Sequence, residues 1–552
     1  MHMEKIPHCS YGELCEKLVL KVPENFNVAF DLLERIARET PDRLCIRHVD
    51  NAENTRDVTF RQLDQAASRV ADALRGQGIR KGDRVLLVLY RRLEWWESLM
   101  GLHKLGAVAI PAPSQLTAHD IEYRLNKARV RAVIIDSTVS GCIEEVRTSC
   151  PDLVLKVQVG GQNLIPGWLD YHTLISGAAD NFPRPSASGE LASGRDPLLI
   201  FFSSGTTGMP KMVLNNHLYP LGHAFTGIYW HNLGSDDIHL TVADTGWGKA
   251  VWGKSYGQWM AGGAVFVYDY RGKFDPVSLL RVMSKGGVTS FCAPPTLYRF
   301  LVREDLSAYD LSNLRHCTTA GELLNASVFE EWKKITGLNI YEGYGQTEST
   351  LQIVTLPCME PKPGSIGRPV PGWNIRLLLP DGSPCPAGEE GEICVDLAEG
   401  NPIGLFDCYL DEPERTAEVL HDGVYHTGDK AWMDEDGYFW FLGRVDDLIK
   451  SSGYRIGPFE VESALVAHKA VVEAAVTGLP DPARGQIVKA TVVLAPGFEP
   501  SAELTLELQE HVRRYTAPYK YPRKVEYVSE LPKTISGKIR RSAIREEDAK
   551  KV

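Results

Sequence analysis

The sequence has no apolar run long enough to cross a bilayer, no closely spaced pair of cysteines and no basic excess. A membrane-spanning helix needs about 20 consecutive apolar residues, and even the run 85–90 is short and flanked by charge. The 11 cysteines are scattered, without CxxC pairs or zinc-type histidine spacing, which predicts reduced core thiols. The formal net charge of −11 argues against a nucleic-acid partner.

The first ten residues also lack the apolar core of a secretory signal. The sequence therefore predicts a cytoplasmic protein without a membrane span. A length of 552 residues exceeds what one hydrophobic core usually supports, so at least two domains are expected. The sequence leaves the oligomeric state, monomer or dimer, open.

Apolar strands alternate with helical spacing through much of the chain. Strands are expected at 84–90, 108–111 and 131–135, with amphipathic segments between them. This βαβ rhythm predicts a mostly parallel sheet, and it recurs between 198 and 336. From about residue 364, glycine and proline become frequent and the strands shorten, which predicts a β-rich subdomain.

The predicted fold class is therefore α/β with two domains. Residues 1–445 would form a large N-terminal domain of two α/β subdomains and a β-rich subdomain. Residues 446–552 carry mixed helix and strand signals, which predict a small α+β domain. The polar stretch 443–447 is the candidate boundary between them.

A loop rich in serine, threonine and glycine, 203–211, follows the apolar strand expected at 198–202. Gly205 and Gly208 permit backbone angles that other residues avoid, so that backbone N–H groups can converge on an anion. Lys211 adds positive charge, and such a loop suits the β- and γ-phosphates of a nucleotide. From composition alone, a surface loop without a ligand is the preferred interpretation. The loop does not match the Walker pattern, which disfavours an ordinary P-loop NTPase.

This loop resembles the phosphate-binding signature of the adenylate-forming superfamily, which includes acyl-CoA synthetases, peptide-synthetase adenylation domains and luciferases. Further motifs follow in the order typical of that superfamily, and the resemblance extends over nearly the whole chain. These motifs are 344–348 (YGQTE), 425–429 (YHTGD), 443–447 (GRVDD), 452–455 (SGYR) and 531–538 (LPKTISGK). The sequence is most similar to the medium-chain acyl-CoA synthetase branch, through 244–247, 293–296 and 519–524.

The resemblance implies an ATP-dependent acid–thiol ligase. A carboxylate would attack the α-phosphate of ATP to form an acyl-adenylate, and coenzyme A would then take the acyl group. Mg²⁺ is the implied metal, with Glu348 and Thr207 as its implied ligands. One carboxylate suits Mg²⁺, because this ion prefers few carboxylates together with phosphate oxygens. Without the resemblance, Glu348 would be interpreted as a solvated surface acid.

The resemblance also assigns residues to the nucleotide. Tyr344 would offer a flat face to adenine, and Thr347 a hydroxyl to the adenylate phosphate. Asp429 would accept from both ribose hydroxyls, although an Asx turn is an alternative. The implied ATP- and AMP-binding residues are Ser203, Ser204, Gly205, Thr206, Thr207, Gly208, Lys211, Gly321, Glu322, Glu342, Gly343, Tyr344, Gly345, Gln346, Thr347, Asp429, Arg444, Arg455 and Lys538.

Lys538 is the implied catalytic lysine, because its glycine-containing loop can deliver an ammonium to the reacting anions. Thr347, Glu348 and Lys211 complete the implied catalytic set. By resemblance, the small domain turns about Asp446 between the two half-reactions. The implied CoA contacts are Gln115, Ser452, Gly453, Tyr454, Arg484, Tyr519, Lys520, Tyr521 and Arg523. The alternative for 519–524 is a solvated charge run.

The acyl pocket is assigned by resemblance to Trp247, Gly248, Lys254 and Ala293. Bulky aromatic side chains there favour short- to medium-chain acids that are branched, compact or aromatic. Lys254 could instead be a surface lysine, as most are. Three alternative functions stay open: an adenylating enzyme that loads a carrier protein, a silent nucleotide-binding protein, and a luciferase-type oxidase.

Overall fold

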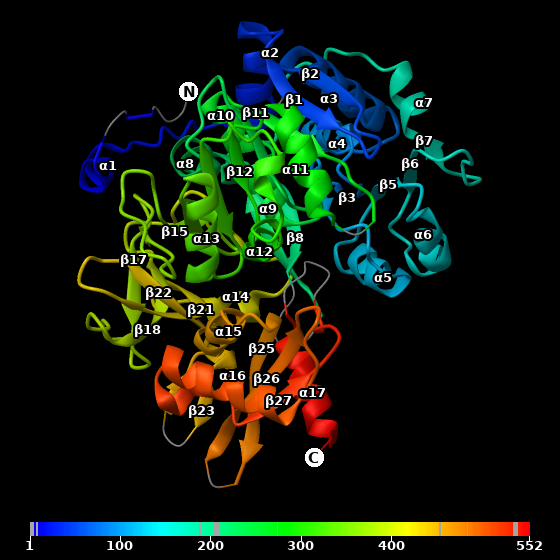
Figure 1. Cartoon of the computed structure of the whole chain (residues 1–552). Coiled ribbons are helices and arrows are strands. Elements are labelled where there is room, and N and C mark those ends of the chain that lie inside the picture. The colour runs from blue at the N-terminus through cyan, green and yellow to red at the C-terminus, as the bar shows by residue number, and fades with distance from the viewer. Residues whose placement is uncertain are drawn as a thin grey trace. The chain divides into compact units, whose positions relative to one another are not determined.

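The computed structural model describes residues 5–6, 9–186, 189–203, 209–272, 274–451, 454–482, 484–533 and 539–551, without the side chains of Asp446 and Arg455 (Figure 1). The chain forms two compact units. The first comprises Met1–Gly321, Ile335–Glu360 and Asn401–Thr416, and the second comprises Glu322–Lys334, Pro361–Gly400 and Ala417–Val552. No helix in the described part of the chain is long and apolar enough to cross a membrane.

The first sheet of unit 1 has the strand order β7–β6–β5–β3–β4–β8–β9–β19. In this order, all neighbours from β7 through to β8 pair in parallel. By contrast, β9 is antiparallel to β8, and β19 is antiparallel to β9. Parallel sheets are covered on both faces, which is why these strands are almost continuously apolar. The bounds are β3 (Arg84–Val88), β4 (Val108–Pro111), β5 (Ala132–Asp136), β6 (Leu155–Val159), β7 (Leu169–Asp170), β8 (Pro197–Ser203), β9 (Lys211–Asn216) and β19 (Cys408–Tyr409).

The second sheet of unit 1 contains the consecutive strands β15–β14–β13–β12–β10–β11–β1–β2. Pairing is parallel except for β14 with β15 and β1 with β2. The bounds are β1 (Leu44–Val49), β2 (Thr55–Thr59), β10 (Ile238–Thr241), β11 (Ala264–Tyr268), β12 (Ser290–Cys292), β13 (His316–Ala320), β14 (Ile340–Gly345) and β15 (Leu351–Val354).

Amphipathic helices follow the strands of these sheets. For example, Ile121 and Leu125 of α5 and Ile143 of α6 pack in one core cluster with Leu86 and Val133 of the sheet. The helices in the first 301 residues are α1 (Tyr11–Lys17), α2 (Arg35–Glu39), α3 (Phe60–Gly76), α4 (Leu93–Leu105), α5 (Ala118–Lys127), α6 (Ser140–Val146), α7 (Tyr171–Ser176), α8 (Tyr219–Phe225), α9 (Gly248–Gly253), α10 (Tyr256–Ala261), α11 (Pro276–Gly286) and α12 (Pro295–Leu301).

Unit 2 contains an antiparallel sheet of short strands. Its order is β17–β18–β21–β20, with β22 paired to β21. The bounds are β17 (Ile375–Leu378), β18 (Glu390–Asp396), β20 (Leu420–His421), β21 (Val424–Met433) and β22 (Phe439–Arg444). The register between β18 and β21 shifts between Glu392 and Cys394, so Ile393 faces the three residues 427–429. Such a bulge re-aims side chains next to it.

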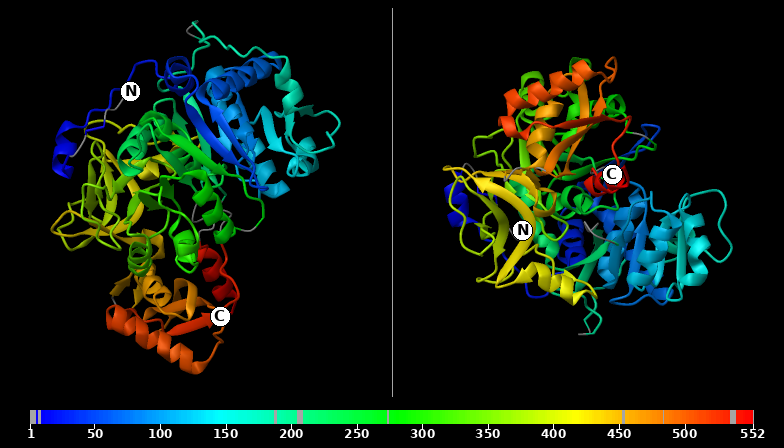
Figure 2. Two further views of the ribbon diagram at one scale, coloured as in Figure 1. Left: turned by 45° about the horizontal axis from the view of Figure 1, so that its top comes forward. Right: turned by 90° about the horizontal axis from the view of Figure 1, so that it is seen from below.

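The C-terminal part of unit 2 is an α+β fold with the strand order β24–β23–β26–β25, and β27 pairs with β26. Helix α17 is fixed to this sheet because the buried ammonium of Lys489 lies 2.5 Å from Asp548 and from Glu526. The elements of this part, coloured from orange to red in Figure 2, are β23 (Ile449–Ser451), β24 (Tyr454–Ile456), α15 (Pro458–Val466), β25 (Val471–Asp481), β26 (Gly485–Leu494), α16 (Ala502–Tyr515), β27 (Lys524–Tyr527) and α17 (Arg541–Lys551).

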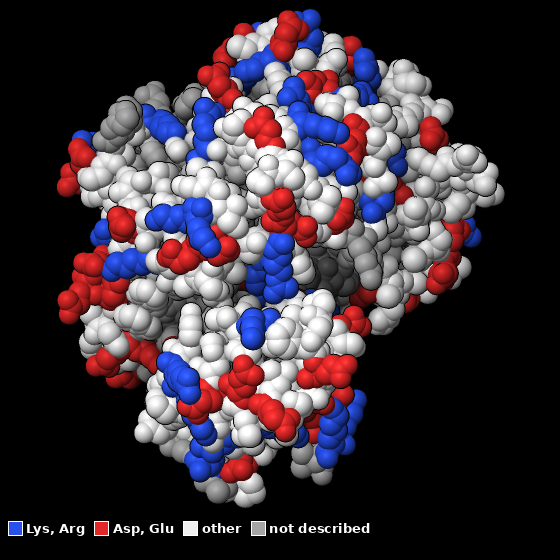
Figure 3. All heavy atoms as spheres, in the orientation of Figure 1, with Lys and Arg blue, Asp and Glu red and all other residues white. Residues whose placement is uncertain are grey.

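These observations confirm the predicted fold class, with two α/β sheets, a β-rich part and an α+β C-terminal part. Acidic and basic side chains are interspersed over the face in Figure 3, as expected from a moderate net charge. The division at 445/446, which marks where the C-terminal part is expected to turn, stays a prediction. Asp446, the predicted pivot, lies within unit 2.

Candidate nucleotide and acyl sites

The phosphate-loop candidate connects two paired strands. β8 ends at Ser203 and β9 begins at Lys211, and these two residues face each other in the antiparallel register. The hydroxyl of Ser203 is buried without a hydrogen-bond partner among the described residues. The loop residues Ser204, Gly205, Thr206, Thr207 and Gly208 lie outside the described residues. The structure thus places both ends of the loop, and the roles of its members stay predictions.

Lys211 belongs to a compact charged cluster with Tyr409 and Glu348. Its ammonium donates to the Tyr409 hydroxyl at 2.5 Å and lies 3.3 Å from Glu348 Oε1. The Tyr409 hydroxyl donates to the same Glu348 oxygen at 2.9 Å. Both Glu348 and Tyr409 are buried, with 8% and 3% of their surface exposed. The cluster therefore holds one carboxylate oxygen and leaves the other free of hydrogen bonds from the described residues.

Tyr409 was not predicted as a site residue. It lies on the two-residue strand β19, whose partner β9 begins with Lys211. The backbone of the same segment also binds the turn at Glu348, because Phe406 N donates to Glu348 O at 2.8 Å. No local pattern marks such a short strand, so the sequence offered no signal for this contact.

The adenine-loop candidate follows β14. Glu342 and Gly343 pair with β13, while Tyr344 and Gly345 pair with β15. Glu342 is 5% exposed, whereas Tyr344, Gln346 and Thr347 are partly exposed. Gly321 directly follows β13 with φ +97°, and Glu322 is the first residue assigned to unit 2. The structure brings the residues 342–348 together with Lys211 in unit 1.

Gly345 has no room for a side chain, because a methyl group there would overlap the Thr350 carbonyl oxygen and approach the Trp252 ring to 2.6 Å. We expect Gly345→Ala to shift the turn at 346–348 and to slow acid-dependent pyrophosphate exchange by about 100-fold, since small displacements of positioning groups have such effects. Gly141→Ala is the matched control, because a methyl group at 141 meets nothing within 4 Å. Exchange by Gly345→Ala within threefold of the control would contradict this expectation.

The ribose-site candidate lies on the bulge of unit 2. Gly428 has φ +70°, and its N–H donates to Glu392 Oε1 at 2.9 Å. Asp429 faces Arg444 across β21 and β22, with 3.5 Å between Arg444 Nη1 and Asp429 Oδ1. Arg444 also donates to the Thr427 carbonyl at 2.9 Å. Asp429 and Arg444 are therefore adjacent in unit 2, and their contacts with ribose stay predictions.

Glu392 was also missed by sequence reasoning. Its second oxygen lies 3.1 Å from His426 Nδ1, so one carboxylate holds both ends of the Thr-Gly turn. The signal available was a charged residue inside β18, a strand that also begins with Glu390 and ends with Asp396, and the sequence did not show what Glu392 faces.

Two of the four acyl-pocket candidates, Lys254 and Ala293, are buried, whereas Trp247 and Gly248 are partly exposed. Trp247 precedes α9, Gly248 begins it, and Lys254 follows it. Burial lowers the pKa of Lys254 to about 7, and its amine donates to the Ala243 carbonyl at 2.8 Å. Lys254 is therefore not the surface lysine that was the alternative. Ala293 is fully buried directly after β12.

The CoA candidates of unit 2 form an aromatic and basic group. The rings of Tyr454 and Tyr519 stack with centroids 4.2 Å apart, and both residues are exposed. Lys520 pairs with Glu460, and Arg523 donates to the Tyr521 hydroxyl at 2.8 Å.

The remaining CoA and catalytic candidates are scattered or outside the described part. Arg484 donates its backbone N–H to Asp481. Gln115 lies exposed in unit 1. Ser452, Gly453 and Lys538 lie outside the described residues, as does the side chain of Arg455. Their roles stay predictions.

Comparison with known proteins gives two family matches, "AMP-binding enzyme" over residues 33–410 and "AMP-binding enzyme C-terminal domain" over residues 460–538. The rat protein "Acyl-coenzyme A synthetase ACSM3, mitochondrial" is 40% identical over 98% of this chain and 93% of its own length. Among solved structures, the anthranilate CoA ligase AuaEII in complex with anthranoyl-AMP has a TM-score of 0.87 and 31% identity, covering 96% of this chain and 98% of its own. A benzoate CoA ligase from Burkholderia xenovorans LB400 has a TM-score of 0.82 and 27% identity, covering 94% and 100%.

The predicted cytoplasmic location is wrong by this comparison. The matched rat, mouse and human relatives are all named as mitochondrial proteins. The prediction rested on the absence of a secretory signal, and that absence does not distinguish the cytoplasm from other compartments.

Proposed function

We infer the chemistry of this protein from its family: the chain belongs to the AMP-binding enzymes, and it is an ATP-dependent, AMP-forming acyl-CoA synthetase. This confirms the resemblance drawn from the ordered sequence motifs. ATP and CoA are its substrates, together with a carboxylic acid. The products are acyl-CoA, AMP and diphosphate, and the intermediate is an acyl-adenylate.

The proposed acid is compact: a short- to medium-chain acid that is branched or aromatic. The observation that carries this proposal is the contact of the Trp252 indole with Gly345, at the end of the strand that leads into the adenine loop. Trp252 is 8% exposed and donates to the Tyr219 hydroxyl at 3.2 Å. A ring fixed in this way limits the length of an acyl group held beside the adenylate. The anthranilate and benzoate ligases among the similar structures support the same class of acid.

In the proposed first half-reaction, an acid oxygen attacks the α-phosphorus of ATP, and diphosphate leaves. Lys211 would offset the negative charge of the phosphates, and Tyr409 would keep its ammonium beside Glu348. Asp429 and Arg444 would bind the ribose, and Tyr344 would stack on adenine. Lys538 would offset the charge that develops as two anions meet. Such positioning and charge stabilisation are the main contributions that a protein makes to phosphoryl chemistry.

The proposed metal is Mg²⁺, with Glu348 as its protein ligand and Thr207 nearby. The residues present fit this ion, because Glu348 offers one oxygen that the described residues leave free. When bound, Mg²⁺ would neutralise the phosphate oxygens that diphosphate carries away. Lys211 and Tyr409 would hold the other oxygen of Glu348 and so fix the direction of the carboxylate.

In the proposed second half-reaction, the CoA sulfur attacks the acyl carbon and AMP leaves with the electron pair of the broken anhydride bond. The C-terminal part would turn about Asp446 to allow this attack, as hinge motions commonly do. Tyr454, Tyr519, Lys520 and Arg523 would contact the nucleotide of CoA. The names of the relatives favour mitochondria as the compartment of the reaction.

The acid class is tested by a panel that includes isobutyrate, hexanoate, benzoate and palmitate, with AMP release as the measured product. We expect kcat/KM for the best compact acid to exceed that for palmitate by at least about 100-fold, because each poorly accommodated part of a chain costs binding energy. Trp252→Leu should shift the preference toward longer acids. Palmitate as the best substrate would contradict the acid class, whereas failure of every acid to support pyrophosphate exchange would contradict the ligase itself.

A further inference from the structure

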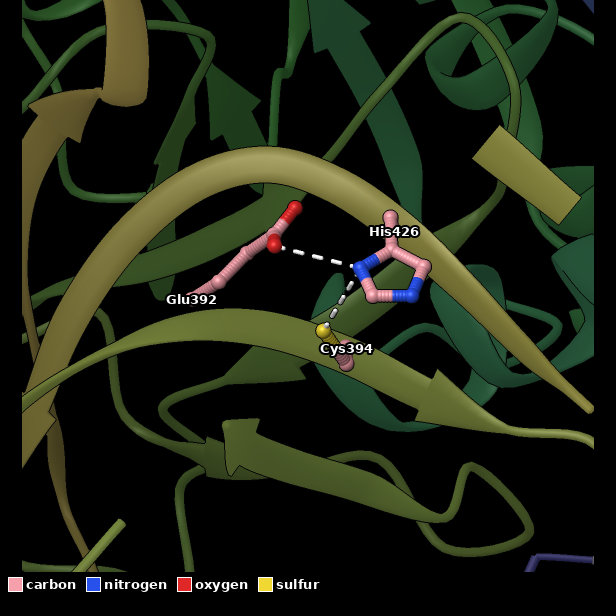
Figure 4. Close-up of side chains that lie close together, drawn as sticks. All are labelled: Glu392, Cys394 and His426. Carbon is pink, nitrogen blue, oxygen red and sulfur yellow. Dashed lines mark hydrogen bonds and ion pairs between the residues drawn. The ribbon is translucent and has the colours of Figure 1, made fainter. Parts of the chain in front are cut away.

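Three side chains of the β18–β21 ladder converge on one point in unit 2 (Figure 4). Glu392 and Cys394 are two residues apart on β18, so their side chains lie on the same face of the sheet. His426 is the direct partner of Cys394 on the antiparallel strand β21. Their ligand atoms all lie within 4.8 Å of one another.

A single ring nitrogen makes both contacts within this cluster. Glu392 Oε2 lies 3.1 Å from His426 Nδ1, and Cys394 Sγ lies 3.6 Å from the same nitrogen. Figure 4 shows both contacts meeting at that one ring atom. A ring nitrogen either carries one proton or accepts one. If it carries the proton, its N–H faces both the Glu392 oxygen and the Cys394 sulfur, which is only a weak acceptor; if it accepts from the thiol, its lone pair faces a carboxylate oxygen.

The two separations measured from His426 Nδ1 match edges of a tetrahedral metal site, and the sulfur and a carboxylate oxygen lie within 4.8 Å of one another. Zinc binds sulfur at about 2.3 Å and nitrogen or oxygen at about 2.0–2.1 Å, which at tetrahedral angles places sulfur about 3.5 Å and oxygen about 3.3 Å from the nitrogen. The observed distances from His426 Nδ1 are 3.6 Å to sulfur and 3.1 Å to oxygen. A thiolate and a carboxylate would also balance the charge of a divalent ion.

The surroundings favour a site that ions can reach. Cys394 is fully buried, whereas Glu392 and His426 are each about one quarter exposed, with side-chain values of 25% and 22%. The ring of His421 stacks on that of His426 with centroids 4.2 Å apart, which fixes the orientation of the imidazole.

We propose that Glu392, Cys394 and His426 form a binding site for a borderline-soft divalent cation such as Zn²⁺, with solvent in the fourth position. Mg²⁺ does not fit, because thiolate and imidazole are not its preferred ligands. The ion displaces the thiol proton of Cys394 and the proton, if present, on Nδ1 of His426. Glu392 can bind through Oε2 while Oε1 keeps its bond to Gly428 N, so the ion braces the turn that carries Asp429.

Co²⁺ is a suitable probe, because cobalt bound to a thiolate absorbs through sulfur-to-metal charge transfer. We expect a saturable band in the full-length protein at one equivalent of Co²⁺, which Zn²⁺ abolishes by displacement. Cys394→Ser should remove the band, and His426→Gln should weaken Co²⁺ binding at least tenfold. Cys385→Ser is the matched control, because this cysteine lies in the same unit outside the cluster, and it should leave the band unchanged.

Two further measurements separate metal binding from folding. Glu392→Gln keeps an oxygen that can accept from Gly428 N–H, so this variant should fold normally. Its affinity for Co²⁺ should nevertheless be at least tenfold lower than that of the wild-type protein. Zn²⁺ should raise the Tm of the wild-type protein by several degrees and leave the Tm of Cys394→Ala unchanged, because a ligand stabilises only the state that binds it. Absence of a saturable band, or the same band in Cys394→Ser, would overturn the proposal. Glu392, Cys394 and His426 would then only hold the turn through hydrogen bonds.

Discussion

Replacing Glu348 by glutamine is expected to slow acid-dependent exchange of pyrophosphate into ATP by about 10²–10³-fold, the usual effect of removing one charge-stabilising group. Glutamine preserves the shape of the side chain and removes its charge. The Tyr409 hydroxyl can still donate to the amide oxygen, whereas the 3.3 Å ion pair with Lys211 is lost. The predicted metal ligand is lost with it, so the rate that remains should reach half of its maximum only at a higher Mg²⁺ concentration.

Tyr409→Phe tests the orientation of the Glu348 carboxylate without changing its charge. This variant keeps the carboxylate and removes the hydroxyl that links it to Lys211. We expect a smaller loss, about 10-fold, which corresponds to one or two hydrogen bonds. Glu144→Gln is the matched control, because Glu144 pairs with Lys156 at 2.7 Å elsewhere in unit 1. Exchange by Glu348→Gln equal to that of this control would refute the role of the carboxylate.

The second large effect expected is loss of stability as the pH falls below about 6.5. Unit 1 buries several neutral histidines, and burial is the main cause that lowers the pKa of His217, His223 and His239 to about 3 and that of His316 to about 4. The unfolded chain takes up protons near pH 6.5 and the folded unit does not. Stability is therefore complete above the unfolded pKa and is lost as the pH falls from about 6.5 toward these lowered values.

The magnitude follows from the linkage between protons and folding. Each such histidine contributes about 1.4 kcal/mol between pH 7.5 and pH 5.5, so four contribute about 5.5 kcal/mol, which is comparable with the whole stability of a domain. Urea unfolding at a series of pH values measures this dependence. His217→Leu should flatten it, because neither ring nitrogen of His217 has a hydrogen-bond partner in the described residues. His172→Leu, at an exposed position, should not. A free energy of unfolding that is constant from pH 7.5 to 5.5 would contradict the expectation.

Sequence patterns predicted the regular part of the fold closely. The expected strand at 84–90 is β3, Arg84–Val88, and the amphipathic segment expected after it contains α4, Leu93–Leu105. Both are long enough for apolar periodicity to determine them. The two-residue strand β19 has no such period, because its position is set by hydrogen bonds to β9, about 200 residues earlier. Tyr409 was missed for that reason.

Site residues that belong to a sequence motif were predicted. Contacts that depend on the register between two strands were missed. The Thr-Gly-Asp motif indicated a turn, yet the bulge opposite Ile393 and its brace by Glu392 follow from the pairing of β18 with β21. The same pairing joins Cys394 to His426, although 32 positions separate them and no zinc-type spacing is present. Lys254 was placed near the acyl group, and its burial against the Ala243 carbonyl depends on tertiary packing.

The return of residues 401–416 to unit 1 affects how the chain can be made. During synthesis, the sheet that begins near residue 84 lacks its last strand until Cys408 and Tyr409 have left the ribosome. A nascent chain that stops at residue 400 would present Glu348 and Lys211 without the phenol that joins them, and with an open β9 edge. Unpaired edges of this kind invite misassembly. Chaperone binding should therefore persist on nascent chains until these sixteen residues emerge, and cleavage within 401–416 should inactivate the enzyme even when both fragments stay associated.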